Sequence, residues 1–116
     1  MEKSPANTQT TLHISEEVVS TVAREAIHEV EGVARLANLP VKASVFMAPS
    51  AARPVRILLN TDVAEVEVGI VVRWNYRLKD VCEQVQAAVK DSVQNMTGVA
   101  VAKVNVHVAG VQVKDE

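Results

Sequence analysis

The sequence contains few of the residues from which catalytic and cofactor sites are usually built. Cys82 is its only cysteine, so no disulfide can form within the chain. The four glycines stand apart from one another and form neither a dinucleotide-binding nor a phosphate-binding loop. Only Phe46, Trp74 and Tyr76 are aromatic. These shortages exclude disulfide scaffolds, zinc sites built from paired cysteines and glycine-rich nucleotide sites.

Long apolar runs and an excess of charge of one sign are also absent. No apolar segment approaches the roughly 20 residues that cross a bilayer, so no direct membrane span is expected. The net charge of -2 argues against a partner that is nucleic acid, because such binders normally carry a basic face. Met1–Gln9 is polar and lacks the apolar centre of a signal peptide. With a single cysteine, this predicts a reducing, cytoplasmic location.

Small β-branched side chains are what the sequence has in quantity. Hydrophobic residues make up 48% of the chain, and valine is the commonest among them. A chain of 116 residues can bury about two-thirds of its unfolded surface, which is enough for one core. We therefore predict a disordered tail over residues 1–8, a single domain over residues 9–113 and a charged C-terminal tail over residues 114–116.

The first half of the domain is predicted to contain a strand, a helix and a less regular region. Apolar alternation indicates a short strand over Gln9–Ile14. Ser15 is placed to cap a helix that runs to about Val30, and Gly32 is placed to end it in the left-handed conformation. Val33–Pro40 is ambiguous between a short strand and a turn. A weak strand is predicted for Val41–Met47, followed by a loop over Ala48–Pro54.

A hairpin and a second helix follow. Alternation over residues 55–60 and 66–72 predicts two antiparallel strands with one charged face, on which Arg56 can pair with Glu65 or Glu67. A helix is expected from about Arg77 to Met96, with Gly98 closing it. Its predicted apolar stripe consists of Leu78, Val81, Cys82, Val85, Ala88, Val89, Val93 and Met96.

The last strand, Val99–Val108, changes phase along its length. Val99 and Val101 share one parity, whereas Val104, Val106 and Val108 share the other. Either a bulge lies near Ala102 and Lys103, or the buried face of the strand changes there. The complete pattern, β-α-β(β)β-α-β, predicts an α+β fold: a two-layer sandwich with two helices on one face of a mainly antiparallel sheet.

No set of residues converges on a reaction. His13, His28 and His107 are scattered, and no two of them have a spacing typical of metal ligands. Glu65 and Glu67 lie on a strand face where solvated charge is expected. Cys82 belongs to an apolar stripe, where a thiol behaves as a small hydrophobic group. We therefore expect no catalytic residues, no metal and no cofactor, and a protein that is not an enzyme.

The aromatic–basic cluster Arg73, Trp74, Tyr76 and Arg77 is the candidate interaction surface. It lies where a strand leads into a helix. Aromatic rings at such a junction can anchor the fold, pack against a partner or stack on a nucleic-acid base. A structural anchor is the reading the sequence favours, with a partner contact as the main alternative.

Three stretches carry a resemblance to a known family. They are ISEEVVSTVAREAIHEVEGVARL (Ile14–Leu36), VEVGIVVRWNYRLKDVCEQVQ (Val66–Gln86) and MTGVAVAKVNVHVAGV (Met96–Val111). Together they resemble the alkaline-shock-protein family, the envelope stress response proteins of Gram-positive bacteria. The family usually has a tyrosine–glycine pair where this chain has Trp74 and Asn75. Asparagine tolerates a positive φ, so we expect the turn to be kept.

The resemblance implies a non-enzymatic protein that serves cell-envelope homeostasis. Members of the family are abundant and cytoplasmic. Some self-associate, and some are held at the membrane by a separate anchor protein. The resulting hypothesis is a scaffold that forms a homo-oligomer or docks on a membrane-anchored partner. Two alternatives stay open: a nucleic-acid-binding module that uses Arg73, Trp74, Tyr76 and Arg77, and a ligand sensor with an apolar pocket.

Overall fold

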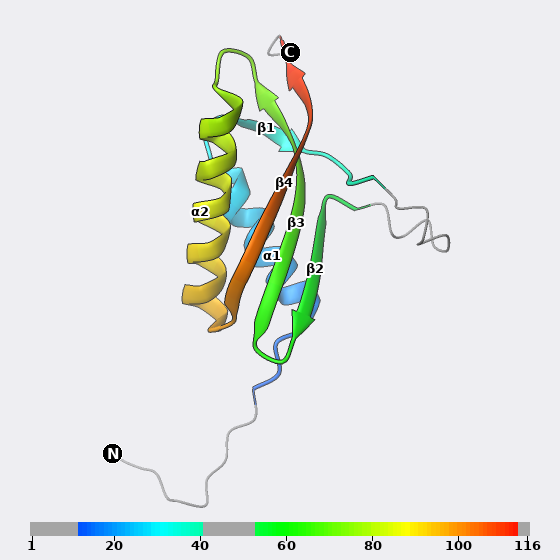
Figure 1. Ribbon diagram of the computed structural model, residues 1–116, viewed down its shortest axis with the longest axis vertical. Helices are drawn as coiled ribbons and strands as arrows, with labels where there is room; N and C mark the ends of the chain where they lie inside the picture. The colour runs from blue at the N-terminus through cyan, green and yellow to red at the C-terminus, as the bar shows by residue number, and fades with distance from the viewer. Residues whose placement is uncertain (1–11, 41–52, 114–116) are drawn as a thin grey trace, which may run out of the picture.

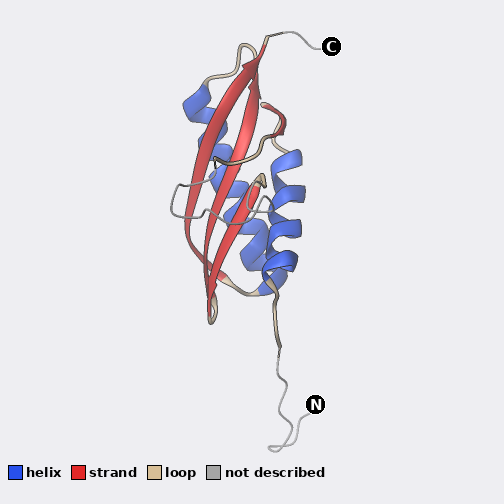
Figure 2. Ribbon diagram, turned by 90° about the vertical axis from the view of Figure 1, so that its right-hand side faces the viewer, coloured by secondary structure: helices blue, strands red, loops and turns tan. Residues whose placement is uncertain are grey.

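The computed structural model describes residues 12–40 and 53–113 of the chain. The elements are α1 (Glu16–His28), β1 (Val33–Leu36), β2 (Val55–Asn60), β3 (Val63–Arg73), α2 (Leu78–Thr97) and β4 (Ala100–Gln112). The strands form one layer, with α1 behind the sheet and α2 alongside β4 (Figure 1). The same two layers are seen from the side in Figure 2. The predicted α+β class and the two-layer arrangement are confirmed.

The long strand β3 is the centre of the sheet. Its first half pairs antiparallel with β2, and its second half pairs antiparallel with β1. The two short strands therefore follow each other along one edge of β3. Along the other edge, β4 runs parallel to β3 over its whole length. The sheet is mainly antiparallel, as predicted, with one parallel pair that the sequence did not indicate.

The core lies between the sheet and the helices. Alternate residues of β3 point into it, and the side chains of Val66, Val68, Ile70 and Val72 are completely buried. Helix α2 contributes a straight line of buried residues at four-residue intervals, namely Val81, Val85, Val89, Val93 and Thr97. The predicted stripe is wrong at its two ends, because Leu78 and Met96 are 46% and 73% exposed. These two positions lie in the first and last turns of the helix.

Two sequence predictions around α1 are corrected. Residues 12–14, the described part of the predicted strand Gln9–Ile14, have no regular structure, and Leu12 is 71% exposed. Two apolar residues directly before a helix cap do not form a ladder with the sheet. The cap itself is confirmed, because the hydroxyl of Ser15 accepts from the Val18 N–H at 3.2 Å.

Gly32 does not end α1 in the left-handed conformation, because its φ is not positive. Among the described glycines, Gly98 alone has a positive φ. Helix α1 ends with Glu29 as its right-handed cap. A Cβ atom on Gly32 would lie 2.6 Å from Cγ2 of Val81 and 2.9 Å from Cδ2 of Tyr76. The glycine therefore permits the close approach of α2 and of the junction before it.

The other predicted elements are either confirmed by the structure or lie outside the described residues. The ambiguous segment Val33–Pro40 contains strand β1 followed by irregular chain. The β2–β3 hairpin is confirmed. Gly98 closes α2 with φ 78°, as expected. The predicted strand Val41–Met47 and most of the loop Ala48–Pro54 lie outside the described residues, as do residues 1–8 and 114–116.

The phase change in β4 is a bulge. Ala64 pairs with Val101 and Glu65 pairs with Lys103, so Ala102 is the extra residue. A second shift leaves Ala109 without a partner in the same way. Val101 belongs to the core, and Val104, Val106 and Val108 pack against that same core. The bulge therefore keeps one buried face along the strand, and the alternative of a swapped face is wrong.

Candidate interaction surface

The strand ends and a helix start come together at one end of the molecule. There β3 ends at Arg73, β4 ends at Gln112 and α2 begins at Leu78 (Figure 1). The Trp74 N–H donates to the carbonyl of Gln112 at 3.0 Å, which ties the junction to the end of β4. Asn75 has φ 76°, so the turn uses the positive φ that the sequence predicted for asparagine.

Three of the four predicted site residues surround one hollow. Arg73, Trp74 and Tyr76 line a depression of about 230 Å³ together with Gln112 and Val113. We call these five residues the junction surface. Arg77 is not part of it. Its Nε atom lies 3.7 Å from Oδ2 of Asp80, and both side chains are largely exposed.

The two aromatic rings have different environments. Tyr76 is 41% exposed, and one side of its ring lies directly against Gly32. It therefore fits the predicted anchor role, since it fills space between the junction and the end of α1. Trp74 is 58% exposed. A tryptophan with more than half of its surface in water contributes little to the core, so its side chain is the one available to a partner.

Arg73 acts mainly within the fold. Its backbone N–H donates to the carbonyl of Gly32 at 2.8 Å, and its Nε donates to the carbonyl of Glu31 at 3.2 Å. These two bonds connect the end of β3 to the turn between α1 and β1. The guanidinium is thus already hydrogen-bonded by protein, which reduces what it can offer to a phosphate.

Sequence reasoning missed the contribution of the C-terminal end of β4 to this surface. Val111 is 42% exposed and Val113 is 61% exposed. With Leu78 and the two aromatic rings, they make up half of the large hydrophobic side chains that are exposed in the described part of the chain. Val111 and Val113 follow the predicted strand out of step with Val104, Val106 and Val108, and only the parallel pairing of β3 with β4 brings that end beside Trp74.

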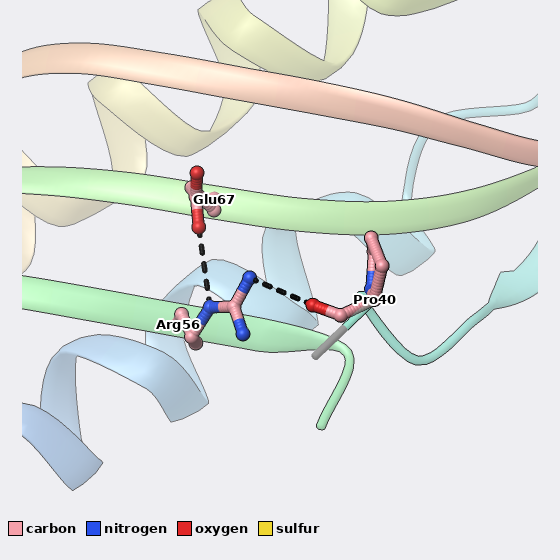
Figure 3. A network of polar contacts seen from close by, with 3 residues as sticks. All are labelled: Pro40, Arg56 and Glu67. Carbon is pink, nitrogen blue, oxygen red and sulfur yellow. Dashed lines mark hydrogen bonds and ion pairs between the residues drawn. The ribbon is translucent and has the colours of Figure 1, made fainter. Parts of the chain in front are cut away.

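Arg56 pairs with Glu67 across the hairpin, as one of the two predicted alternatives. The distance from Nε to Oε1 is 3.2 Å, and both side chains are about three-quarters buried. The same guanidinium donates to the carbonyl of Pro40 at 3.3 Å (Figure 3). The pair therefore joins β2, β3 and the chain that follows β1. This arrangement stabilises the fold and gives no sign of acid–base chemistry.

The other candidate groups stay dispersed. His13, His28 and His107 are exposed on different parts of the fold. Within the described ranges, no three His, Cys, Asp or Glu side chains gather closely enough to hold a metal ion. Burial raises the pKa of the Cys82 thiol, so the reactive thiolate is disfavoured at neutral pH. Neither helix of residues 12–40 and 53–113 is long and apolar enough to cross a membrane.

Comparison with known proteins adds a family and a fold. A profile of the alkaline shock protein 23 family, described by a cell envelope-related function, matches residues 4–113. The Bacillus subtilis (strain 168) protein YqhY is 27% identical over 103 residues, which cover 87% of this chain and 76% of YqhY. YloU of the same organism is 27% identical over 106 residues, or 88% of each chain. Both relatives carry the name of uncharacterized proteins.

Solved structures with a similar fold include forms of the MamM CTD. Its copper form has a TM-score of 0.53 at 15% identity, covering 86% of this chain and 90% of that one. A zinc form has a TM-score of 0.51 at 15% identity, covering 85% and 89%. At this identity the likeness establishes the fold alone.

Proposed function

Because the chain belongs to the alkaline shock protein 23 family, whose function is related to the cell envelope, we propose that it is a non-enzymatic scaffold. It serves cell-envelope homeostasis by self-association or by docking on a membrane-anchored partner. The observation that carries this proposal is Trp74, a large aromatic side chain left 58% exposed beside a hollow in the junction surface.

The composition of the junction surface supports a protein partner. Tryptophan and tyrosine are the residues most often found at the energetic centre of protein interfaces. Here they stand next to Val113, which is 61% exposed, and near the exposed Leu78. Removing this apolar surface from water would stabilise a complex by about 25 cal/mol for each Å² buried, before the cost of association.

A second copy of the chain is the partner that the junction surface suits best. In a two-fold arrangement each copy presents the same patch, so one exposed tryptophan beside one hollow becomes two complementary contacts. The surface combines an exposed tryptophan ring with a depression of about 230 Å³ that the ring helps to line. Self-association through this end would leave the sides of the sheet accessible to a different partner, such as a membrane anchor.

The nucleic-acid alternative is less well supported by the same residues. Arg73 donates to the carbonyl of Glu31, and Arg77 lies beside Asp80. Both cations of the predicted cluster therefore have protein groups next to them. The aromatic rings alone would give base stacking without the phosphate contacts that usually dominate such binding.

Sedimentation velocity over a dilution series tests the proposal. The wild-type chain is expected to gain mass with concentration, and Trp74→Ala to stay monomeric. Met96→Ala is the matched control, since Met96 is 73% exposed in the last turn of α2, far from the junction. Association of Trp74→Ala at the wild-type level would contradict the proposal. So would a strictly monomeric wild type that binds single-stranded RNA in a salt-dependent, Trp74-dependent way.

A further inference from the structure

The sheet has two edges, and one of them is protected. Strand β4 carries extra residues at Ala102 and Ala109, which interrupt its register. Gln94 Oε1 accepts from the Val101 N–H at 3.0 Å. Gln86 Nε2 donates to the carbonyl of Val104 at 3.1 Å. Bulges and side-chain caps of this kind prevent another strand from pairing along an edge.

Strand β2 forms the other edge. Within residues 12–40 and 53–113 no bulge or side-chain cap lies along it, and the nearest backbone contact is the Leu39 N–H, which donates to the carbonyl of Arg53 at 2.9 Å just before the strand begins. Its register with β3 runs without a shift from Val55 to Asn60. The Gly69 N–H donates to the carbonyl of Pro54 at 2.9 Å, so residue 54 faces β3. Because antiparallel strands alternate these directions, Val55, Ile57 and Leu59 point their N–H and C=O groups away from β3. Among the described strands, β2 has β3 as its only neighbour.

A groove of about 520 Å³ runs between the β2 edge and α1. Its walls include Glu16, Glu17 and Arg24 from the helix and Arg53, Val55 and Ile57 from the strand side. A strand added to β2 would place its backbone on the edge and every second side chain in the groove. An edge strand flanked by a helix is a common way for domains to bind extended peptides.

The charges of the groove are separated along its length. Helix α1 and strand β2 run in opposite directions (Figure 1). Arg24, in the middle of α1, therefore lies toward Arg53 at the start of β2, and both line the groove. Glu16 and Glu17, in the first turn of α1, lie at the other end. The groove thus has a basic end and an acidic end.

We propose that the β2 edge binds an extended peptide of a partner protein as an added antiparallel strand. Antiparallel addition runs from the acidic end of the groove to the basic end. The peptide therefore carries a basic residue at its N-terminal side, alternating apolar residues in its centre and a carboxylate at its C-terminal side. This inference rests on the docking role proposed above, and it assigns that role to a surface separate from the junction surface.

Selection from a phage-displayed library of random octapeptides against the full chain tests the proposal. The expected result is enrichment of peptides with a basic start, apolar alternation and an acidic end. The amide signals of Val55, Ile57 and Leu59 should shift when a synthetic selected peptide is added. Methylating the peptide nitrogens that face β2 should abolish binding, whereas methylating the alternate nitrogens should not.

Two proline variants test whether the peptide binds at the β2 edge. Ile57→Pro removes an outward N–H and should abolish binding, while Val106→Pro on β4 should not. If Ile57→Pro does not fold, the double change Arg24→Glu and Arg53→Glu should shift selection toward peptides with a basic C-terminal side. No enrichment, or enrichment that survives both changes, would overturn the proposal. Loss of self-association in Ile57→Pro without any selected peptide would assign the edge to a second copy and would also overturn it.

The self-association proposal and the peptide-binding proposal can be tested independently. Trp74→Ala should keep peptide binding at the wild-type level, because the β2 groove contains no residue of the junction surface. Loss of self-association alone therefore reports on the junction surface, and loss of peptide binding alone reports on the β2 edge.

Discussion

Gly32 shows what a single missing side chain does for this fold. The glycine is buried where α2 and Tyr76 approach the turn after α1. Its backbone carbonyl also accepts from the Arg73 N–H at 2.8 Å. The sequence marks a glycine here, but it cannot show that Val81 comes within contact distance from a different helix. The role of Gly32 was therefore predicted wrongly as a helix stop.

Gly32→Ala is expected to destabilise the protein by about 1–3 kcal/mol, because the added methyl must displace packed side chains. Urea denaturation measures this change. Gly110→Ala is the control, since a Cβ atom there meets nothing within 4 Å, and we expect a change within about 0.5 kcal/mol. Equal stabilities of Gly32→Ala and wild type would show that the contact is not tight.

Cys82 gives a second prediction at the same scale. Burial raises the pKa of its thiol above the ordinary value of 9.0. The neutral form is favoured in the folded state, so its contribution to stability is complete below the unfolded pKa and is lost as pH rises through the folded pKa. The rate of alkylation by iodoacetamide against pH should reach its half-maximum above 9.0 in the folded protein and lower in denaturant. Fast alkylation at neutral pH would contradict this.

At the scale of elements, the bulge in β4 determines which residues are buried. Alternation alone left two readings of the valine pattern, and the pairing with β3 decides between them. An alternating sequence pattern cannot by itself locate a bulge, because the extra residue is defined by the strand that pairs with it. The parallel pairing of β3 and β4 is missing from the sequence prediction for the same reason, because the order of strands depends on long-range contacts.

Deleting Ala102 is expected to leave the fold and its buried residues unchanged. The remaining sequence, Val101 followed by Lys103 and Val104, alternates in step with β3 without the bulge. Deleting Asn105 instead should turn the following valines toward solvent, at a cost of roughly 1 kcal/mol or more for each valine exposed. Thermal denaturation of the two deletion variants compares them. Equal melting temperatures for the two would contradict the assigned register.

The sequence correctly predicted those features that depend only on residues close together in the chain. The Ser15 cap, the β2–β3 hairpin and the Gly98 stop all depend on residues within a few positions of each other. The positive φ of Asn75 was expected from the family resemblance, in which a glycine usually occupies this position. The predicted strand Gln9–Ile14 depended on a neighbouring strand to pair with. Its described residues have none, so propensity without a partner did not produce a strand.

At the scale of the whole molecule, the fold presents two surfaces of different chemistry. The junction surface combines exposed aromatic and valine side chains at one end. The β2 edge has no second strand beside it among the described residues, and it carries a groove with separated charges along one side. A protein with one surface for its own copies and another for an extended peptide can link an assembly to an anchor, which is what we propose for the family function at the cell envelope.

The sequence predicted part of the junction surface. Trp74 and Tyr76 were identifiable because aromatic residues are so rare in this chain. Arg77 was included through its position next to them, but it lies outside the hollow. Gln112 and Val113 could not be assigned, since they are far from Trp74 in sequence and reach it only through the end of β4.

Trp74 provides the most direct measurement of the central claim, because it is the only tryptophan and its fluorescence reports on that one side chain. The emission spectrum and its quenching by acrylamide should be followed through a dilution series of the native chain. If the junction surface is the self-association site, the emission shifts to shorter wavelength and quenching falls as concentration rises. If the protein gains mass with concentration while the Trp74 emission and quenching stay constant, the surface lies elsewhere and the account is contradicted.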